Sequence, residues 1–160
     1  MKSGANKSRC HGDTPGKVRD APLRHNMPSN TDSHLAEIYR KYIQAICDHD
    51  LDSIATFVAD GVVHNGAVLG LQGYKDLLLK NIVETDVQVE IKRLIANDDH
   101  VAALLVFTTK TTTLELIGIK LDNHPFSYTE NVIYDFRDDK IVEVHSLFDI
   151  DRIRAHALKA

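Results

Sequence analysis

The hydrophobic pattern of this chain changes its period once, and that change limits the folds that the chain can adopt. Between residues 35 and 83, apolar residues recur three and four positions apart, which places them on one face of a helix. From residue 87 onward, apolar and polar residues alternate as they do along a half-buried strand. Helices followed by antiparallel strands predict an α+β domain, with the helices on one face of a curved sheet. Such a sheet encloses an apolar hollow, where small ligands usually bind.

The expected elements follow from apolar spacing and turn residues. A first helix should begin near Ser33, whose oxygen suits an N-cap, and should end at residues 48–50. The first long strand should turn Val87 and Ile95 to the same buried side. Further helices are expected just after residue 50, over 71–83 and from about residue 150. Strands are expected at 62–64, 87–95, 101–111, 114–119, 126–136 and 141–149.

Charge divides the chain into a basic start and an acidic body. Residues 1–34 hold six lysine and arginine residues against three aspartates, which leaves 13 basic and 20 acidic residues in the remainder. An acidic body repels phosphate backbones, so nucleic acid is not an expected partner. We expect residues 1–32 to be a disordered, solvated extension, with a weak targeting sequence as the alternative. Residues 33–160 should form one domain.

Several classes of protein are excluded by missing signals. No apolar run approaches the length of a membrane span, and the N-terminus has no apolar signal region, so we expect no membrane association. The two cysteines show no metal-type spacing and fit a reducing, cytoplasmic compartment. The nine histidines are scattered, so no metal is expected. Nucleotide-binding and nucleophile-elbow motifs are absent.

The last two strands bring polar groups together. A two-residue turn at Asp138-Asp139 sets a register in which Val132 lies opposite His145. Glu130, His145 and Asp149 then project from one face of the hairpin. A carboxylate among apolar neighbours loses hydration, which raises its pKa towards neutral pH, and a nearby imidazole adds a second proton-transfer group. These three residues are therefore candidate catalytic groups.

A second arrangement of the same hairpin stays open. Glu130 and His145 would then lie on the outer face, in solvent or in a subunit interface, because charged residues are rarely buried without a partner. The opposite face is at least as apolar and carries Asn131 and Ser146, which are candidate substrate-binding residues. A single β-bulge in either strand exchanges the two faces.

Two further groups of residues are candidates for the pocket. His64 ends a short strand just before an Asn65-Gly66 turn, where it could donate to a carbonyl or move a proton, or could serve only the turn. Asn65 is a candidate substrate-binding residue beside it. Tyr42 and Tyr74 lie on the apolar faces of helices, where tyrosines are mostly core residues, although a hydroxyl could reach the cavity.

An ordered set of short motifs runs through the body of the chain. Its members are Val63-His64-Asn65-Gly66, Gly70, Gly73-Tyr74, Phe107-Thr108, Phe126-Ser127, Thr129-Glu130 and Tyr134-x-Phe136-x-Asp138-x-Lys140-Ile141-x-Glu143-Val144-x-Ser146-x-x-Asp149. With these motifs, residues 34–155 resemble the SnoaL-like polyketide cyclase and ester cyclase family of the nuclear-transport-factor-2-like superfamily. The resemblance implies a cone-shaped α+β barrel, a deep apolar pocket, no cofactor and a homodimer.

The resemblance also implies a chemistry, from which this sequence departs. Members of the family close polyketide rings by aldol condensation, with a histidine and an aspartate of the final hairpin as acid and base. Here the aspartate position falls on Ser146 and the histidine position on or beside Val132. A histidine that some relatives carry in the preceding strand is replaced within residues 111–113. Glu130, His145, Asp149 or His64 would therefore have to supply the protons.

Two functions remain in view. The first is a cofactor-independent cyclase, isomerase or dehydratase of secondary metabolism that acts on a small apolar or aromatic, polyketide-like carbonyl compound. The second is a non-catalytic carrier or small-molecule binding protein on the same fold, because a fold does not determine a function. The loss of the acid/base pair that the resemblance implies favours the second.

Overall fold

The computed structural model describes residues 33–84, 87–109, 113–116, 119–122 and 126–157. Residues 1–32, for which the sequence predicts a disordered extension, lie outside this part of the chain. The helices are α1 (His34–Cys47), α2 (Ile54–Phe57), α3 (Gly70–Leu78), a π-helical turn η2 (Leu79–Val83) and α4 (Ile150–Ala157). The strands are β1 (Val58–His64), β2 (Ala67–Val68), β3 (Val87–Ala96), β4 (His100–Thr109), β5 (Thr113–Leu116), β6 (Ile119–Asp122), β7 (Phe126–Arg137) and β8 (Lys140–Phe148).

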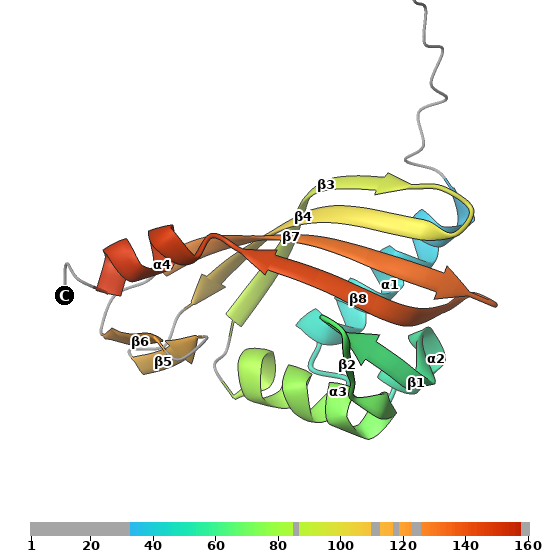
Figure 1. Ribbon diagram of the computed structural model, residues 1–160, viewed down its shortest axis with the longest axis horizontal. Coiled ribbons are helices and arrows are strands. Elements are labelled where there is room, and N and C mark those ends of the chain that lie inside the picture. The colour runs from blue at the N-terminus through green and yellow to red at the C-terminus, as the bar shows by residue number, and fades with distance from the viewer. Residues whose placement is uncertain (1–32, 85–86, 110–112, 117–118, 123–125, 158–160) are drawn as a thin grey trace, which may run out of the picture.

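Six strands form one curved, unclosed sheet in the order β2-β1-β8-β7-β4-β3. Figure 1 shows β3, β4, β7 and β8 side by side, with α1 behind them, α3 beside β1, and α4 at the end of the sheet away from the β7–β8 turn. The predicted α+β class with N-terminal helices and a C-terminal helix is confirmed. The sheet is mixed rather than wholly antiparallel, since β1 runs parallel to β8. No hairpin joins these two strands, so nothing in the sequence forces them to be antiparallel.

The segment predicted as one strand at 114–119 forms two strands instead. β5 and β6 pair only with each other, as a separate two-stranded sheet. The prediction of one continuous strand over 114–119, in line with the strands of the main sheet, is therefore wrong.

The first helix forms for the reasons that the sequence suggests. The Oγ of Ser33 accepts a hydrogen bond from the N–H of Ala36 at 3.2 Å, which satisfies one of the free donors of the first turn. The helix ends where His49 adopts a φ of 58°, a left-handed conformation that does not continue an α-helix. Its apolar stripe, which includes Tyr39 and Tyr42, is buried in the core. Within the described residues, no helix is both long and apolar enough to span a membrane.

Two β-bulges change which side chains face the core. In β3 the register shifts between Ile91 and Arg93, so that Ile95 is 66% exposed and the inward prediction for Ile95 is wrong. In the β7–β8 hairpin the predicted two-residue turn is present, with φ values of 51° and 61° at Asp138 and Asp139. The register shifts directly after it.

The second bulge determines the geometry of the site. Phe136 lies opposite Ile141, but Asp135 lies opposite Glu143, which leaves Val142 as an extra residue of β8. Beyond the bulge Val132 lies opposite Ser146, where the sequence predicts His145. The register prediction is therefore wrong beyond the turn, because one added residue exchanges the faces of a strand.

Candidate functional site

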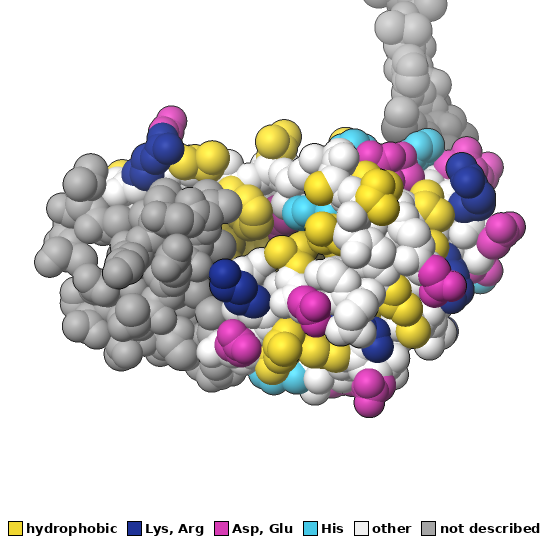
Figure 2. Space-filling model, turned by 60° about the horizontal axis from the view of Figure 1, so that its bottom comes forward, with side chains coloured by type: hydrophobic (Ala, Val, Ile, Leu, Met, Phe, Trp, Pro, Cys, Tyr) yellow, Lys and Arg dark blue, Asp and Glu magenta, His cyan; other side chains and the backbone are white. Residues whose placement is uncertain are grey.

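A cavity of about 570 Å³ lies between the inner face of the sheet and the helices α1 and α3. Its volume is within the range of small-molecule sites. In Figure 2 hydrophobic side chains surround a hollow beside the grey residues. The wall is mostly aliphatic and aromatic, with Ile43, Leu78, Leu105, Phe107, Tyr128 and Phe148 among its members. The rings of Phe107 and Tyr128 stack with centroids 5.1 Å apart and an interplanar angle of 4°.

Six of the nine sequence-predicted site residues line this cavity. They are Tyr42, His64, Asn65, Tyr74, Glu130 and Ser146. They come from α1, β1 and its following turn, α3, β7 and β8. Residues distant in the sequence therefore meet at one place, as a binding site requires.

Glu130 is the buried carboxylate of the cavity. Its side chain is 8% exposed on the inward face of β7, and the hydroxyl of Ser146 donates a hydrogen bond to its Oε1. None of the ion pairs among the described residues includes Glu130. Burial raises the pKa of Glu130 from 4.5 to about 7, and the hydrogen bond from Ser146 opposes part of this rise. Near neutral pH the group can both release and accept a proton.

Ser146 is held in turn by Asn65. The Oδ1 of Asn65 accepts the backbone N–H of Ser146 at 2.8 Å, and its Nδ2 donates to the Ser146 carbonyl oxygen at 3.3 Å. The backbone N–H of Asn65 donates to the carbonyl oxygen of Val144 at 2.9 Å. Asn65 therefore lines the cavity while its amide is bonded to β8, a role that the sequence does not indicate.

His64 is the last residue of β1 and is half-buried at the cavity. Its ring lies 6.3 Å from the ring of Tyr74, centroid to centroid, at an angle of 55°. Burial lowers the pKa of His64, and the charge of His145 lowers it further. The imidazole is therefore mainly neutral at pH 7 and can act as a hydrogen-bond donor or acceptor.

Tyr42 and Tyr74 form a hydroxyl pair at the cavity. Their oxygens are 2.6 Å apart, and both side chains are buried. Burial raises the pKa of both tyrosines, and the nearby carboxylate of Glu130 adds to the rise, so both remain neutral. Two neutral hydroxyls have two protons and only one lies between them. The hydroxyl of Tyr134 also interacts with Tyr42, so the second proton can go either to Tyr134 or to an acceptor in the cavity.

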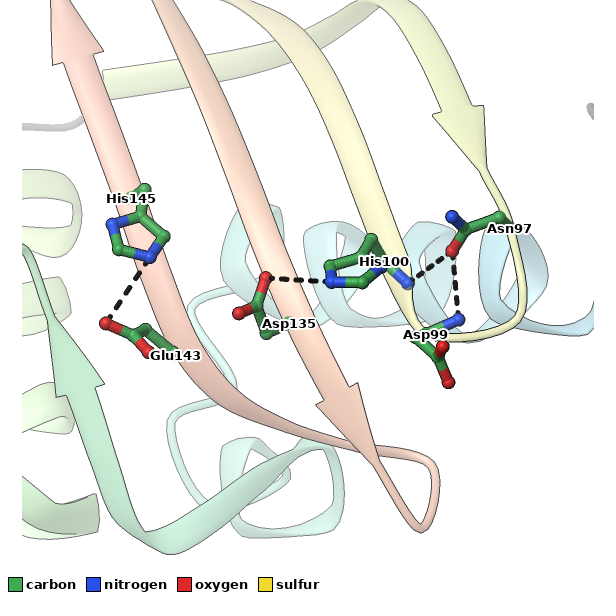
Figure 3. A network of polar contacts seen from close by, with 6 residues as sticks. All are labelled: Asn97, Asp99, His100, Asp135, Glu143 and His145. Atoms are coloured by element: carbon green, nitrogen blue, oxygen red, sulfur yellow. Dashed lines mark hydrogen bonds and ion pairs between the residues drawn. The ribbon is translucent and has the colours of Figure 1, made fainter.

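The remaining three predicted residues lie outside the cavity. His145 is 51% exposed, and its Nε2 lies 3.3 Å from the Oε1 of Glu143 on the outer face of the sheet (Figure 3). Asn131 is exposed on the same face. Asp149 is exposed and accepts the backbone N–H of Arg152 at 3.1 Å, which caps the first turn of α4. The predicted common face of Glu130, His145 and Asp149 is wrong because of the bulge at Val142.

A different polar cluster lies on the outer face. Asp135, Glu143 and His145 each offer a ligand atom, and these atoms lie within 4.8 Å of one another. Figure 3 shows the three side chains on the neighbouring strands β7 and β8, with His100 beside Asp135. These residues could hold a divalent cation together. Linear spacing in the sequence gives no sign of them, since they meet only through strand pairing.

The cavity also contains residues that the sequence does not single out. Lys80 and Asn81 line it from η2, which the sequence predicts as ordinary α-helix. The wider π-helical turn lets neighbouring residues face the same side, and such turns are frequent at functional sites. Nothing in the apolar spacing distinguishes this turn from a helix.

The comparisons with known proteins identify the family and support the fold. The family model described as SnoaL-like polyketide cyclase matches residues 36–155. The chain belongs to the SnoaL-like polyketide cyclase family. A SnoaL-like polyketide cyclase from Agrobacterium tumefaciens is 31% identical, with a TM-score of 0.69 over 75% of this chain and 97% of that one. No curated protein matches this chain.

More distant structures share the fold of this SnoaL-like protein. IdmH, a putative polyketide cyclase from Streptomyces antibioticus, is 18% identical, with a TM-score of 0.64 over 80% of this chain and all of that one. A putative ketosteroid isomerase from Kribbella flavida is 15% identical, with a TM-score of 0.56 over 71% of this chain and 76% of that one. The predicted family is thus confirmed.

Within this SnoaL-like fold the carboxylate of the cavity comes from β7. The resemblance places the aspartate of the final hairpin at Ser146, and Ser146 contacts the carboxylate of Glu130.

Proposed function

We propose that this chain is a cofactor-independent enzyme of the cyclase or isomerase type, which acts on a polyketide-like carbonyl compound with Glu130 as its general base. One observation carries the proposal: a carboxylate that is 8% exposed faces the cavity, and burial raises its pKa to about 7. A base of this kind is partly ionised at neutral pH and strong enough to take a proton.

The chemistry follows from the groups around the cavity. Glu130 removes a proton from the carbon next to a substrate carbonyl, and the electron pair of the broken C–H bond moves onto the carbonyl oxygen. The enolate oxygen accepts a hydrogen bond from the Tyr42–Tyr74 pair or from His64. In a cyclase the enolate carbon attacks a second carbonyl of the same molecule, and the new alkoxide takes the proton from Glu130. In an isomerase the proton returns to a different carbon.

The wall of the cavity supports a small apolar or aromatic substrate. The stacked rings of Phe107 and Tyr128 offer a flat surface, and a volume of about 570 Å³ accommodates a compound of a few fused rings. Holding such a flexible compound in a reactive conformation contributes several kcal/mol, on the order of the effects measured for intramolecular reactions.

The test uses exchange of a carbon-bound proton, which does not require the natural substrate. With 2-tetralone as an apolar ketone probe in D₂O, the protein should accelerate deuterium incorporation, and Glu130→Gln should slow it by on the order of 100-fold or more. Glu143→Gln is the matched control, because Glu143 lies on the outer face. Exchange at an unchanged rate in Glu130→Gln, with intact folding, removes Glu130 from the mechanism.

The alternative is a non-catalytic carrier or binding protein. Ser146 and Val132 stand where the resemblance implies the aspartate and the histidine, which favours this alternative. It requires saturable binding of 2-tetralone with no exchange and no dependence on Glu130 or His64. That result would replace the enzyme proposal.

A homodimer is the proposed assembly, and the cytoplasm the proposed location. Three large apolar side chains are exposed on β3, β7 and β8, namely Ile95, Ile133 and Leu147. Exposed apolar groups on one sheet face support an interface between two copies. Sedimentation equilibrium should find a dimer that Ile133→Asp weakens; a wild-type monomer contradicts the assembly.

The proposed cytoplasmic location is supported by the unpaired Cys47, which fits a reducing compartment, and cell fractionation would test it.

A further inference from the structure

The parallel pairing of β1 with β8 ends beside the candidate site. The register runs as far as His64 opposite Val144, after which the chain turns away through Asn65 and Gly66. Asn65 and Gly66 have φ values of 48° and 80°, so the backbone leaves the strand at this point. Ser146, two residues beyond Val144, would then have a free N–H and C=O on this side of β8.

The side chain of Asn65 takes the place of the missing strand. An amide carries one acceptor and one donor group in the same arrangement as a peptide unit. Both are used on one residue: Oδ1 accepts the Ser146 N–H at 2.8 Å, and Nδ2 donates to the Ser146 carbonyl oxygen at 3.3 Å. The amide of Asn65 therefore extends the β1–β8 pairing by one residue. The backbone of Ser146 cannot shift beyond the end of β1 without breaking these two bonds.

The held residue is the one that contacts the carboxylate. Ser146 is 7% exposed, and its hydroxyl donates to Oε1 of Glu130 on the neighbouring strand. The hydroxyl proton of a serine can rotate towards an acceptor, so the hydrogen bond to Glu130 depends on where the backbone of Ser146 places its Oγ. We propose that Asn65 is a positioning residue for Glu130: its amide fixes the backbone of Ser146, and this keeps the Ser146 Oγ within hydrogen-bond reach of the carboxylate.

Direct substrate binding by Asn65, the role that the sequence predicts, fits the geometry less well. A substrate group would have to displace one of the two amide–backbone bonds and leave a Ser146 backbone group without a partner. Such a loss costs about 1–3 kcal/mol. An effect of Asn65 on catalysis rests on the proposed role of Glu130 as the base. The structural link from Asn65 through Ser146 to the Glu130 carboxylate is independent of that role.

The experiment measures the acidity of Glu130 and needs no substrate. In protein labelled with ¹³C at glutamate, the δ-carboxyl of Glu130 is titrated in wild type, Ser146→Ala, Asn65→Ala and the double variant. The other titratable groups around the cavity are His64, Lys80 and the tyrosines Tyr39, Tyr42, Tyr74, Tyr128 and Tyr134. The tyrosines stay neutral over the range, and His64 is followed separately.

The expected result has two parts. Ser146→Ala should raise the titration midpoint of Glu130 by roughly one pH unit or more, since a hydrogen bond to a charged group is lost. Asn65→Ala should raise it in the same direction, and the double variant should add little to Ser146→Ala because both act through one hydroxyl.

Asn97→Ala is the matched control. The Oδ1 of Asn97 accepts the backbone N–H groups of Asp99 and His100 at 2.9 and 2.7 Å in the β3–β4 turn (Figure 3). This variant should lower stability without moving the Glu130 midpoint. A midpoint that is unchanged in Asn65→Ala, or fully additive effects in the double variant, overturns the inference.

Kinetics separate this inference from the proposed function. If Glu130 is the base, Asn65→Ala should lower kcat and move its pH profile with little change in KM, whereas loss of a substrate contact would raise KM. If Glu130→Gln keeps full activity, the proposed function fails, and the ¹³C titration still decides whether Asn65 positions the carboxylate.

Discussion

The two faces of the β7–β8 hairpin carry similar residue types in opposite surroundings. The inner face presents Glu130 and Ser146 to the cavity, and the outer face presents Asp135, Glu143 and His145 to solvent. On the inside a carboxylate has a neutral hydrogen-bond partner and a pKa of about 7. On the outside, carboxylates and imidazoles lie near one another in water, where such pairs contribute up to about 1 kcal/mol.

The difference shows that hydration, rather than residue type, decides which group can serve as a base. Glu130 has lost most of its water and has no cationic partner among the described residues, so its charged form is disfavoured. Glu143 keeps solvent contact and lies beside His145. One extra residue, Val142, determines which of these side chains lies on which face.

The largest expected effect comes from deleting single residues of β8, either the bulge residue Val142 or His145, which lies beyond the bulge. Deleting Val142 removes the bulge and leaves Tyr134 opposite Val144 and Val132 opposite Ser146, so the fold should tolerate it. Deleting His145 forces either Ser146 to the outer face or Glu143 into the core. Burying an unpaired carboxylate or reversing the strand costs several kcal/mol, which is comparable to the whole stability of a domain.

Thermal unfolding of the two deletion variants measures this contrast. The variant without Val142 should keep a cooperative transition, and the variant without His145 should lose most or all of it. Equal stability of the two variants would show that the bulge does not control the two faces.

The next effect in size is the dependence of stability on pH. Folding raises the pKa of Glu130 from 4.5 to about 7, so the folded chain binds this proton more tightly than the unfolded chain. The carboxylate therefore costs nothing below pH 4.5, and its cost grows between pH 4.5 and 7 to about 3 kcal/mol. Glu130→Gln should stabilise the protein by up to that amount at pH 8 and by almost nothing at pH 4.

Denaturant unfolding at both pH values tests this expectation, with Glu143→Gln as the control. The exposed control should change stability by no more than about 1 kcal/mol at pH 8. If Glu130→Gln is neutral or destabilising at pH 8, the carboxylate is hydrated or paired, and the contrast between the faces disappears.

Local signals in the sequence were sufficient for much of the fold. The N-cap at Ser33 and the two-residue turn at Asp138-Asp139 are confirmed because they depend on neighbouring residues only. The same local reasoning named Glu130, His64, Tyr42 and Tyr74 as candidates for the pocket, and all four line one cavity, although it left open which face of the hairpin carries Glu130. It succeeded where a strand or helix period continues without interruption.

Long-range packing decided the features that the sequence did not reveal. The bulge at Val142 allows Tyr134 and Val144 to lie on the core face together. No turn residue in the sequence indicates this bulge. The amide of Asn65 substitutes for a strand that ends, and that role exists only because β1 runs beside β8. The cluster of Asp135, Glu143 and His145 likewise depends on pairing between strands.

The smallest expected effect links the two faces across β8. His64 faces the cavity opposite Val144, and the charge of the adjacent His145 contributes to the lowered pKa of His64, after burial. His145→Gln removes that charge, so the pKa of His64 should rise but remain below its ordinary value, because burial is unchanged. His100→Gln, which removes another outer-face imidazole, should leave it in place.

Titration of the histidine ring protons by NMR measures both variants. The lowered pKa of His64 also affects the stability of the fold. The folded chain binds a proton at His64 less well than the unfolded chain does. Protonation therefore destabilises the fold as the pH falls through the ordinary pKa of histidine, about 6.5. His145→Gln should weaken this acid-side loss. A pKa of His64 that does not respond to His145 would mean that the sheet isolates its two faces, and the cavity would then be independent of the charges outside it.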